Sequence, residues 1–460
     1  MKQTSFEWAQ ASFGHVNLND PRRTKRLVSL ASSLAKQPGV SVAKLNYSPS
    51  EMEGAYRFIR NDSIQATDIA DAGFQTTIQK AKEHDLLLAL EDSTTLYFSH
   101  VSVEEELGHG NRKRSKDRAL IAHSILLFAP NSQSVIGLAE QRLWTRNINS
   151  RGQKAQRAVR AYEDKESYKW ELASRNMAER FGSEMSKVLS VCDREADLYE
   201  YLSYKSVHNQ RFVVRSMQSR YIEECSEKLY DYVSRLKPAG GKRIHIPQRG
   251  GRKSRVAELE ITYAPVTVRA PAKKTGEGIS LYYVGCTERG REEDKLTWHL
   301  LTSETITNAA DAHRIISYYE RRWLVEDYHK TWKTEGTNVE SLRMQTQNNL
   351  ERMITILAFI ATRLLELRFI KENKELARRS CEGTLSNRAW KLLWLKQESR
   401  ELPATAPDMD WLYKNLATLG GWKDTKRTGR ASVKVLWEGW FRLQTILEGY
   451  ELAKSLESDL

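Results

Sequence analysis

The sequence predicts an α/β protein in which a mixed sheet with flanking helices lies between two all-α regions. Three observations point to this arrangement. Short apolar runs bounded by turn residues, typical of buried strands, alternate with charged helical stretches after the first 68 residues. A β-rich segment follows at about residues 211–304. Both ends carry helical spacing instead, and 460 residues exceed what one hydrophobic core usually serves, so we expect two or three domains.

The first region, residues 1–68, is expected to be a small helical module. Asp20 is placed to cap a helix that has Pro21 at its first position and runs toward Gly39. A second helical piece follows from Ser50. The module is basic and aromatic, and such a module can dock on a nucleic-acid duplex.

The central region, residues 69–372, begins with strands. The apolar run 86–90 predicts a buried strand that ends at Glu91 and Asp92, and two further strands on either side of Pro130 complete an antiparallel meander. A charged helix and then a strand over residues 188–192, ending at Asp193, come next. The β-rich segment at 211–304 reads as an insertion, and long helices follow it.

The last region, residues 373–460, is predicted to be helical. A linker with two prolines precedes a final helix whose Leu436, Trp440, Leu443 and Leu447 form one apolar stripe. Such a stripe packs either on the core of the same chain or on a second copy. Both possibilities stay open from the sequence.

Charge points to a polyanionic partner. The 72 basic residues outnumber the 59 acidic ones, which gives a formal charge of +13. Several basic clusters lie in turn-like segments that can approach a phosphate backbone, although basic loops can equally serve only to keep a protein in solution. The clusters lie at residues 22–26, 112–118, 242–255 and 423–430.

Cysteine spacing and the ends of the chain suggest a cytoplasmic protein without membrane contact. The four cysteines form no close pair, which argues against a zinc ribbon and a disulfide framework. The N-terminus lacks an export signal. The longest apolar run, from Met353, is interrupted by Thr355, Thr362 and Arg363, so it reads as a buried helix.

Asp92 and Asp193 share a setting, because each follows an apolar strand. A buried strand delivers a side chain to the sheet edge with little conformational freedom, and two such carboxylates could hold a hard cation such as Mg²⁺. The alternative is that each aspartate only forms a turn or caps a helix. The pair is more specific than either residue alone.

The stretch 318–336 predicts a two-faced helix. Tyr319, Arg322, Glu326, Lys330 and Lys333 fall within a band of about 80°. On one interpretation they are surface ion pairs worth about 0.2–0.5 kcal/mol each. On the other, Glu326 is the third carboxylate of a site with two metal ions about 4 Å apart, and the cationic residues stabilise a phosphoryl transition state.

The spacing Tyr319-x2-Arg322-x3-Glu326-x6-Lys333 resembles the signature of cut-and-paste DDE transposases of the insertion-sequence-four family. Further motifs of that family occur here in the same order over nearly the whole chain: DPRRTKRL, EGAYRFIRN, LALEDSTTL, VCDREAD, RFVVRS, LLTSE, NLERM and TKRTG. The resemblance implies a ribonuclease-H-like catalytic core with a β-rich insertion. It also implies an N-terminal DNA-binding domain and a C-terminal dimerisation domain.

Carried over to this chain, the resemblance makes Asp92, Asp193 and Glu326 the catalytic triad that binds two Mg²⁺ ions, for which Mn²⁺ substitutes. Trp298 takes up a base flipped from the duplex while the cut end closes into a hairpin; without the family it reads as an ordinary strand aromatic. The DNA-binding candidates in the catalytic region are Tyr319, Arg322, Lys333, Lys330, Arg215, Lys242 and Arg243, and those in the N-terminal module are Arg22, Arg23, Arg26 and Lys36.

The implied partners are double-stranded DNA, as transposon ends and as target, and a second copy of the chain in the DNA-bound complex. The implied reaction is nicking by water, hairpin formation by the freed 3′-OH, hairpin opening and strand transfer. Two alternatives remain: a ribonuclease-H-like nuclease or resolvase, and a catalytically silent DNA-binding regulator derived from a transposase. The localisation implied is the bacterial cytoplasm, on the nucleoid when bound.

Overall fold

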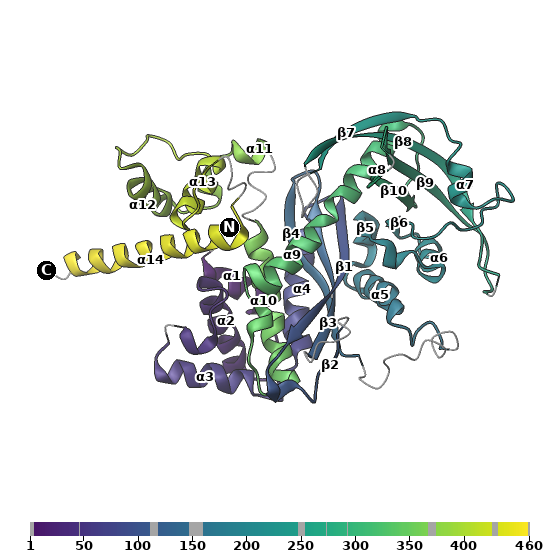
Figure 1. The fold of residues 1–460 in the computed structure, drawn as a ribbon. Coiled ribbons are helices and arrows are strands. Elements are labelled where there is room, and N and C mark those ends of the chain that lie inside the picture. The colour runs from purple at the N-terminus through teal and green to yellow at the C-terminus, as the bar shows by residue number, and fades with distance from the viewer. Residues whose placement is uncertain are drawn as a thin grey trace.

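One sheet runs through the computed structural model (Figure 1). The structure describes residues 4–45, 47–110, 118–146, 160–246, 254–272, 274–291, 293–366, 374–425 and 431–458. Within them the ten strands follow the order β2-β3-β1-β5-β6-β10-β9-β8-β7, and β4 pairs with β3. The strands are β1 Leu87–Phe98, β2 Gly108–His109, β3 Arg118–Ala129, β4 Ser134–Trp144, β5 Val188–Cys192, β6 Arg211–Arg215, β7 Gly240–Ile246, β8 Arg255–Val268, β9 Ile279–Glu288 and β10 Thr297–Thr302.

The sheet is mixed, as the sequence predicts. β1 pairs antiparallel with β3 and β3 antiparallel with β4, which confirms the meander. β1 pairs in parallel with β5, and β5 in parallel with β6. The fold class is therefore α/β, with the mixed sheet and flanking helices of a ribonuclease-H-like core.

The first strand is longer than predicted. The prediction that it ends at Glu91 and Asp92 is wrong, because β1 continues to Phe98. Its second half pairs with β3, from Ser93 opposite His123 to Phe98 opposite Arg118. Thr94 and Thr95 belong to a residue type that favours strands, so the pairing extends through the polar stretch. Asp92 thus lies inside β1, where the parallel pairing with β5 has ended.

The β-rich segment continues the core sheet. β6 pairs with β5, and β10 pairs antiparallel with β6, so the segment at 211–304 begins and ends in the same sheet as Asp92. β9, β8 and β7 then extend that sheet at the end farthest from the N-terminal helices (Figure 1). No separate layer is needed to accommodate them.

The N-terminal helices are α1 Ser5–Phe13, α2 Pro21–Lys36, α3 Pro49–Ile59 and α4 Ala66–Ala81. Asp20 caps α2 as predicted, since its Oδ1 accepts a hydrogen bond of 2.8 Å from the amide of Arg22. α1 was not expected; it starts with a capping box between Thr4 and Glu7. Buried Arg352 of α10 ties this region to the core by donating to the carbonyls of Ile59 and Ile64.

Helices cover the two faces of the sheet. α8 Ala309–Arg321 and α9 Trp323–Lys330 share a hydrophobic cluster with Val213 and Leu300. α6 Tyr199–Val207 and α7 Leu229–Val233 share another with Val214 and Leu301. Because side chains alternate along a strand, these clusters lie on opposite faces. α5 Lys169–Phe181 lies beside α6, and α10 Gln347–Glu366 packs between the N-terminal helices and β4.

The helix predicted over 318–336 is interrupted. It breaks at Arg322, between α8 and α9, and its last turn, Thr331–Glu335, is a π-helix. A π-turn widens the spacing to five residues, so Lys333 leaves the face expected from a regular helix. Short 3-10 turns elsewhere span Val42–Lys44, Val101–Val103, Glu166–Tyr168, Gly182–Lys187, Arg194–Ala196, Val339–Ser341 and Cys381–Gly383.

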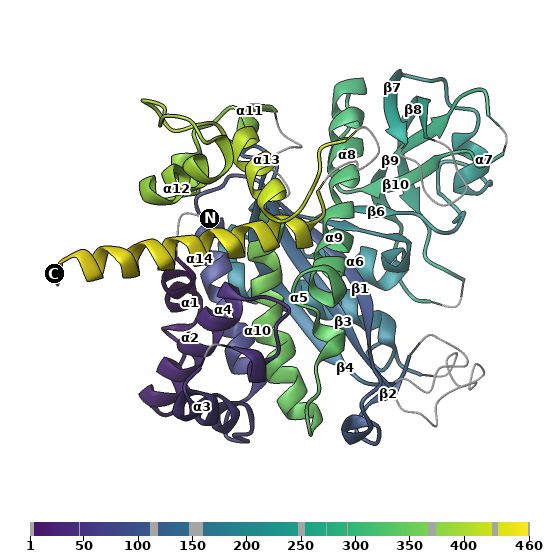
Figure 2. The ribbon, with the colours of Figure 1, turned by 60° about the vertical axis from the view of Figure 1, so that its left-hand side comes forward.

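The C-terminal region consists of α11 Lys374–Ala377, α12 Asn387–Glu398, α13 Met409–Leu419 and α14 Val433–Ser458. The predicted stripe on α14 packs on the chain's own core, where Leu436, Trp440 and Leu443 are buried. The end of α14 projects from the molecule in both views (Figures 1 and 2). None of the helices in the described ranges has the length and apolarity needed to cross a membrane.

Candidate active site

Asp92 and Asp193 are brought side by side by strand register. The last parallel pair of β1 and β5 is Leu90 with Val191. Asp92 follows Leu90 by two residues, and Asp193 follows Val191 by two residues. Both side chains therefore point to the same face of the sheet. That face is the one covered by α8 and α9.

Asp193 also performs the turn-forming role considered above. Its Oδ1 accepts a hydrogen bond of 2.8 Å from the amide of Glu195 and caps the short turn Arg194–Ala196. This bond fixes the carboxylate relative to the end of β5. Burial raises the pKa of Asp193 above its ordinary value.

Glu326, on α9, approaches the two aspartates through a shared arginine. Arg322 donates from one guanidinium nitrogen to Glu326 Oε1 at 2.5 Å, and its other nitrogen lies 3.9 Å from Asp92 Oδ2. The Arg322 side chain is only 12 % exposed. The predicted i,i+4 contact thus exists, but it faces the carboxylates instead of solvent.

The electrostatics of this cluster are dominated by negative charge. The pKa of Asp92 is raised to about 7, chiefly by burial; Arg322 and the amide of Ser93 oppose this shift, whereas Asp193 and Glu326 add to it. Burial alone would lower the pKa of Arg322, yet Tyr319, Asp92 and Glu326 together hold it above its usual range. The site therefore favours an additional cation.

The three carboxylates fit a hard divalent cation by their chemistry, since carboxylate oxygens are the donors that Mg²⁺ prefers. They do not stand in a closed ligand set. Within the described ranges, no group of three acidic, histidine or cysteine side chains has the geometry to hold a metal. Arg322 lies between Asp92 and Glu326, and its positive charge neutralises part of their negative charge.

His329 belongs to this site although the sequence analysis did not select it. Its Nδ1 lies 3.8 Å from Asp92 Oδ2, and the ring is buried. The pKa of His329 is lowered to about 3, chiefly by burial and also by the nearby Lys333, His123 and Arg322. The signal in the sequence was its place three residues after Glu326, which puts it on a neighbouring face of the same helix.

The two lysines predicted beside the triad differ. Lys333 donates to the carbonyl of Thr95 at 2.7 Å and is therefore held against β1 beyond Asp92. Lys330 is 61 % exposed and forms an ion pair of 2.5 Å with Glu335. The structure brings Lys333 to the site and turns Lys330 toward solvent.

Tyr319 and Trp298 form one aromatic unit. Their ring centroids lie 5.4 Å apart in an edge-to-face arrangement. Tyr319, on α8, is buried, whereas Trp298, on β10, is only partly buried. Arg322 also stands over the Tyr319 ring at 6.0 Å, so the aromatic unit is in contact with the arginine of the carboxylate cluster.

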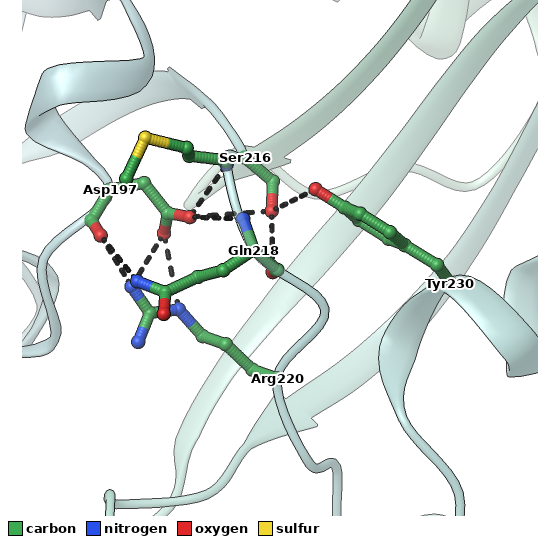
Figure 3. Close-up of polar contacts among 6 residues, drawn as sticks. Asp197, Ser216, Gln218, Arg220 and Tyr230 are labelled. Atoms are coloured by element: carbon green, nitrogen blue, oxygen red, sulfur yellow. Dashed lines mark hydrogen bonds and ion pairs between the residues drawn. The ribbon is translucent and has the colours of Figure 1, made fainter.

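A second buried aspartate lies four residues after Asp193. Asp197 accepts hydrogen bonds from the amides of Met217 and Gln218 and from the hydroxyl of Ser216, and it pairs with Arg220 (Figure 3). It joins the turn after β5 to the loop after β6. Sequence reasoning missed this residue because its partners are 19 to 23 positions away.

The remaining basic candidates of the catalytic region have described polar partners other than the triad. Arg215 donates to the carbonyl of Thr297 at 3.0 Å, which places it beside Trp298. Lys242 and Arg243, both on β7, pair with Glu320 at 2.7 Å and Glu258 at 2.8 Å. Much of the basic clusters at 112–118, 242–255 and 423–430 falls outside the described residues.

The N-terminal candidates lie on or near the surface of α2. Arg22 is exposed, and Arg23 donates to the carbonyl of Leu18 at 3.0 Å. Arg26 packs over Gly54 of α3, where a Cβ would meet its guanidinium at 2.5 Å. Lys36 lies 3.9 Å from Glu448 of α14.

Comparison with protein-family models gives two matches. Residues 5–64 match the model described as transposase DNA-binding. Residues 215–363 match the model described as transposase DDE domain, a stretch that contains Trp298, Arg322 and Glu326. The matches occur in the order expected of such an enzyme, and together they support a DDE-type transposase.

Proposed function

We propose that the chain is a DNA transposase of the insertion-sequence-four type. It would bind the terminal inverted repeats of its element, cut them through a hairpin intermediate and join the 3′-OH ends to target DNA. The observation that carries the proposal is that Arg322 lies between Asp92 and Glu326, while Asp193 is near enough to interact electrostatically with Asp92 and Arg322. The two family matches support the same class of chemistry.

The three carboxylates are proposed to hold divalent metal, Mg²⁺ in two positions with Mn²⁺ as a substitute. Bound there, the metal would activate the attacking oxygen and stabilise the leaving one. Asp92 must lose its proton for this role, because its pKa lies at about 7 in the protein without metal. Asp193 would bind the metal with its carboxylate, which the hydrogen bond from the Glu195 amide already orients.

Arg322 and Lys333 are proposed to bind phosphate. The guanidinium of Arg322 can exchange the carboxylates for a phosphate group, with which it forms similar paired hydrogen bonds. Lys333 lies on the opposite side of Asp92 along β1, fixed by Thr95. Together the two cations would bind a phosphodiester beside the carboxylates.

Trp298 is proposed to stack on a base that leaves the duplex when the hairpin forms. The terminal bases of a tight hairpin cannot stack on one another, and an indole face offsets part of that loss. Support comes from the edge-to-face contact of Trp298 with Tyr319, which holds the indole in one orientation. Tyr319 would act mainly through this contact, since its side chain is buried.

The domain organisation is part of the proposal. Residues 1–68 would bind the transposon ends through Arg22, Arg23, Arg26 and Lys36, and residues 69–372 would catalyse the reaction, with Arg215, Lys242 and Arg243 on the DNA. Residues 373–460 would form the dimer in the DNA-bound complex. The place of action would be the nucleoid of a bacterial cytoplasm.

The test is incubation of the full chain with Mg²⁺ and duplexes that carry the inverted repeats flanking its coding sequence. Hairpin-ended fragments and joined products are expected. Asp92→Asn, Asp193→Asn and Glu326→Gln should retain binding but lower nicking by on the order of a thousandfold, since each removes a ligand. Glu227→Gln, at an exposed carboxylate paired with Arg235, is the matched control.

Full nicking by any of the three amide variants would refute the site. Cleavage without hairpins or joining would favour the nuclease alternative, and binding without cleavage by the wild-type chain would favour the regulator. Trp298→Ala should slow hairpin formation more than nicking; equal slowing of both steps would argue against base flipping.

A further inference from the structure

Met217 is a large apolar residue that stands exposed two residues beyond the end of β6. Its relative exposure is 58 %. β10 and β6 pair antiparallel with Leu300 opposite Arg215, and the amide of Ser216 donates to the carbonyl of His299 at 2.7 Å. One more step in this register places Met217 opposite Trp298.

The backbone of Met217 is firmly held. Asp197 Oδ2 accepts from the Met217 amide at 2.7 Å and from the Gln218 amide at 3.3 Å (Figure 3). Ser216 donates to Asp197 and receives a hydrogen bond from Tyr230. Tyr230 in turn stacks on His299, the neighbour of Trp298, at 4.2 Å. The loop is therefore rigid at the point where it exposes an apolar side chain.

Register also places this loop on the catalytic face. β5 and β6 pair in parallel with Cys192 opposite Val214, so Asp193 and Arg215 are neighbours on one face. Met217 follows Arg215 by two residues and shares that face. The hydroxyl of Ser216 points the other way, toward Tyr230. Met217 thus lies in the row that leads from the carboxylates to Trp298.

An exposed thioether on a rigid support beside an indole suits a flat apolar guest. Thioethers make favourable contacts with aromatic rings, and methionine adapts its shape to what it meets. The setting of Arg215 and Arg322 favours a guest attached to a phosphate chain. An unstacked nucleobase at a DNA end meets both conditions.

We propose that the neighbouring side chains of Met217 and Trp298 form one apolar surface, the slot, on which the unstacked base lies during hairpin formation. Asp197 is the positioning residue that fixes Met217 in this surface. The inference rests on the proposed function and deepens it, because it assigns a second contact to the base. Met217 would contribute by its apolar side chain, whereas Asp197 would contribute through the loop.

The test compares Met217→Ala with Met217→Leu and with Val207→Ala, a control at a similarly exposed residue at the end of α6. Each variant is tested as the full chain on inverted-repeat duplexes with Mg²⁺. Met217→Ala should slow hairpin formation by about threefold to tenfold and leave end binding and nicking unchanged. Met217→Leu should restore most of the rate, and Val207→Ala should match the wild type.

A second readout does not depend on cleavage. In an Asp92→Asn background, 2-aminopurine replaces the terminal bases one at a time in duplexes whose first strand is already nicked. The base in the slot should fluoresce weakly against Trp298, and adding Met217→Ala should raise its emission and lower its anisotropy. Melting of each variant confirms that the fold is retained.

The possible failures are distinguishable. If the wild type forms hairpins and Met217→Ala equals it in rate and fluorescence, the slot is refuted and the proposed function stands. Equal slowing of nicking and hairpin formation would also refute the slot. If the wild type does not nick these duplexes, the proposed function fails, and the slot fails with it.

Discussion

Two aspartates that follow the parallel pairing of β1 and β5 have opposite surroundings. Asp197 is fully buried, and two backbone amides, a hydroxyl and the Arg220 guanidinium all donate to it at 2.7–3.4 Å. Asp92 faces Arg322 and His329 at 3.9 and 3.8 Å, beyond hydrogen-bond distance, and has two further carboxylates nearby. The first carboxylate is satisfied by the protein, and the second is not.

On the proposed function, the difference separates a structural carboxylate from a metal ligand. Burying a charge is costly unless it is paired and hydrogen-bonded, and Asp197 meets that requirement within the chain. Asp92 meets it only partly, as its raised pKa indicates. On the proposed function, an incompletely compensated carboxylate fixed by strand register is suited to bind a metal ion.

The largest expected effect on stability is that of removing the satisfied carboxylate. Asp197→Ala should lower the free energy of unfolding by about 3–5 kcal/mol, because it leaves Arg220 buried without its partner. Thermal or denaturant melting of the full chain measures the loss. The control is Glu227→Ala, which breaks the exposed ion pair with Arg235 and should cost less than about 1 kcal/mol. Similar losses of unfolding free energy in both variants would show that Asp197 is no more important for stability than an exposed ion pair.

The next effect has the opposite sign. The folded-state pKa of Asp92 lies above its unfolded value, so the folded protein binds an extra proton between about pH 4 and pH 7. The stability that protonated Asp92 contributes is fully present below the pKa of the unfolded state. It is lost as the pH rises through about 7. Without metal, Asp92→Asn should therefore be more stable than the wild type at pH 8 by about 2–4 kcal/mol, and much less so at pH 5.

Melting curves at the two pH values, with a chelator present, provide the measurement. Adding Mg²⁺ at pH 8 should stabilise the wild type and leave Asp92→Asn nearly unchanged. A gain in stability for Asp92→Asn that does not depend on pH would contradict the idea that its charge is poorly compensated.

The smallest effect concerns the two lysines. Lys333→Ala should slow cleavage about tenfold, since a hydrogen-bonded charge near the reacting phosphate contributes about 1.5 kcal/mol. Lys330→Ala, at an exposed surface pair, should change it by no more than about twofold. Single-turnover nicking of inverted-repeat DNA at fixed salt separates them. Equal effects would place Lys330 on the DNA despite its pairing with Glu335.

The sequence predicted those features that local signals determine. The Asp20 cap, the strand before Asp193 and the apolar stripe of α14 all depend on neighbours within one helix or strand, and each is confirmed. The DDE-type assignment depended on short motifs with fixed spacing. Such signals need no knowledge of tertiary pairing.

The features it missed depend on distant partners. β1 runs past Asp92 because β3 pairs with it, and Asp197 is satisfied by a loop that begins 19 residues later. Regular helical geometry placed Lys330 and Lys333 on one face, but the π-turn Thr331–Glu335 lies between them and separates their directions. Met217 gave no signal, since only the register with β10 places it opposite Trp298.

The continuous sheet bears on which base of a DNA end can reach Trp298. From β1, which carries Asp92, three neighbouring steps lead through β5 and β6 to β10, which carries Trp298. At the usual spacing of paired strands these steps amount to roughly 14 Å. Backbone hydrogen bonds between these strands keep the distance from β1 to β10 constant. On the proposed function, the distance of a base from the cut along the DNA strand would decide which base occupies the slot. The identity of that base, A, C, G or T, would matter little.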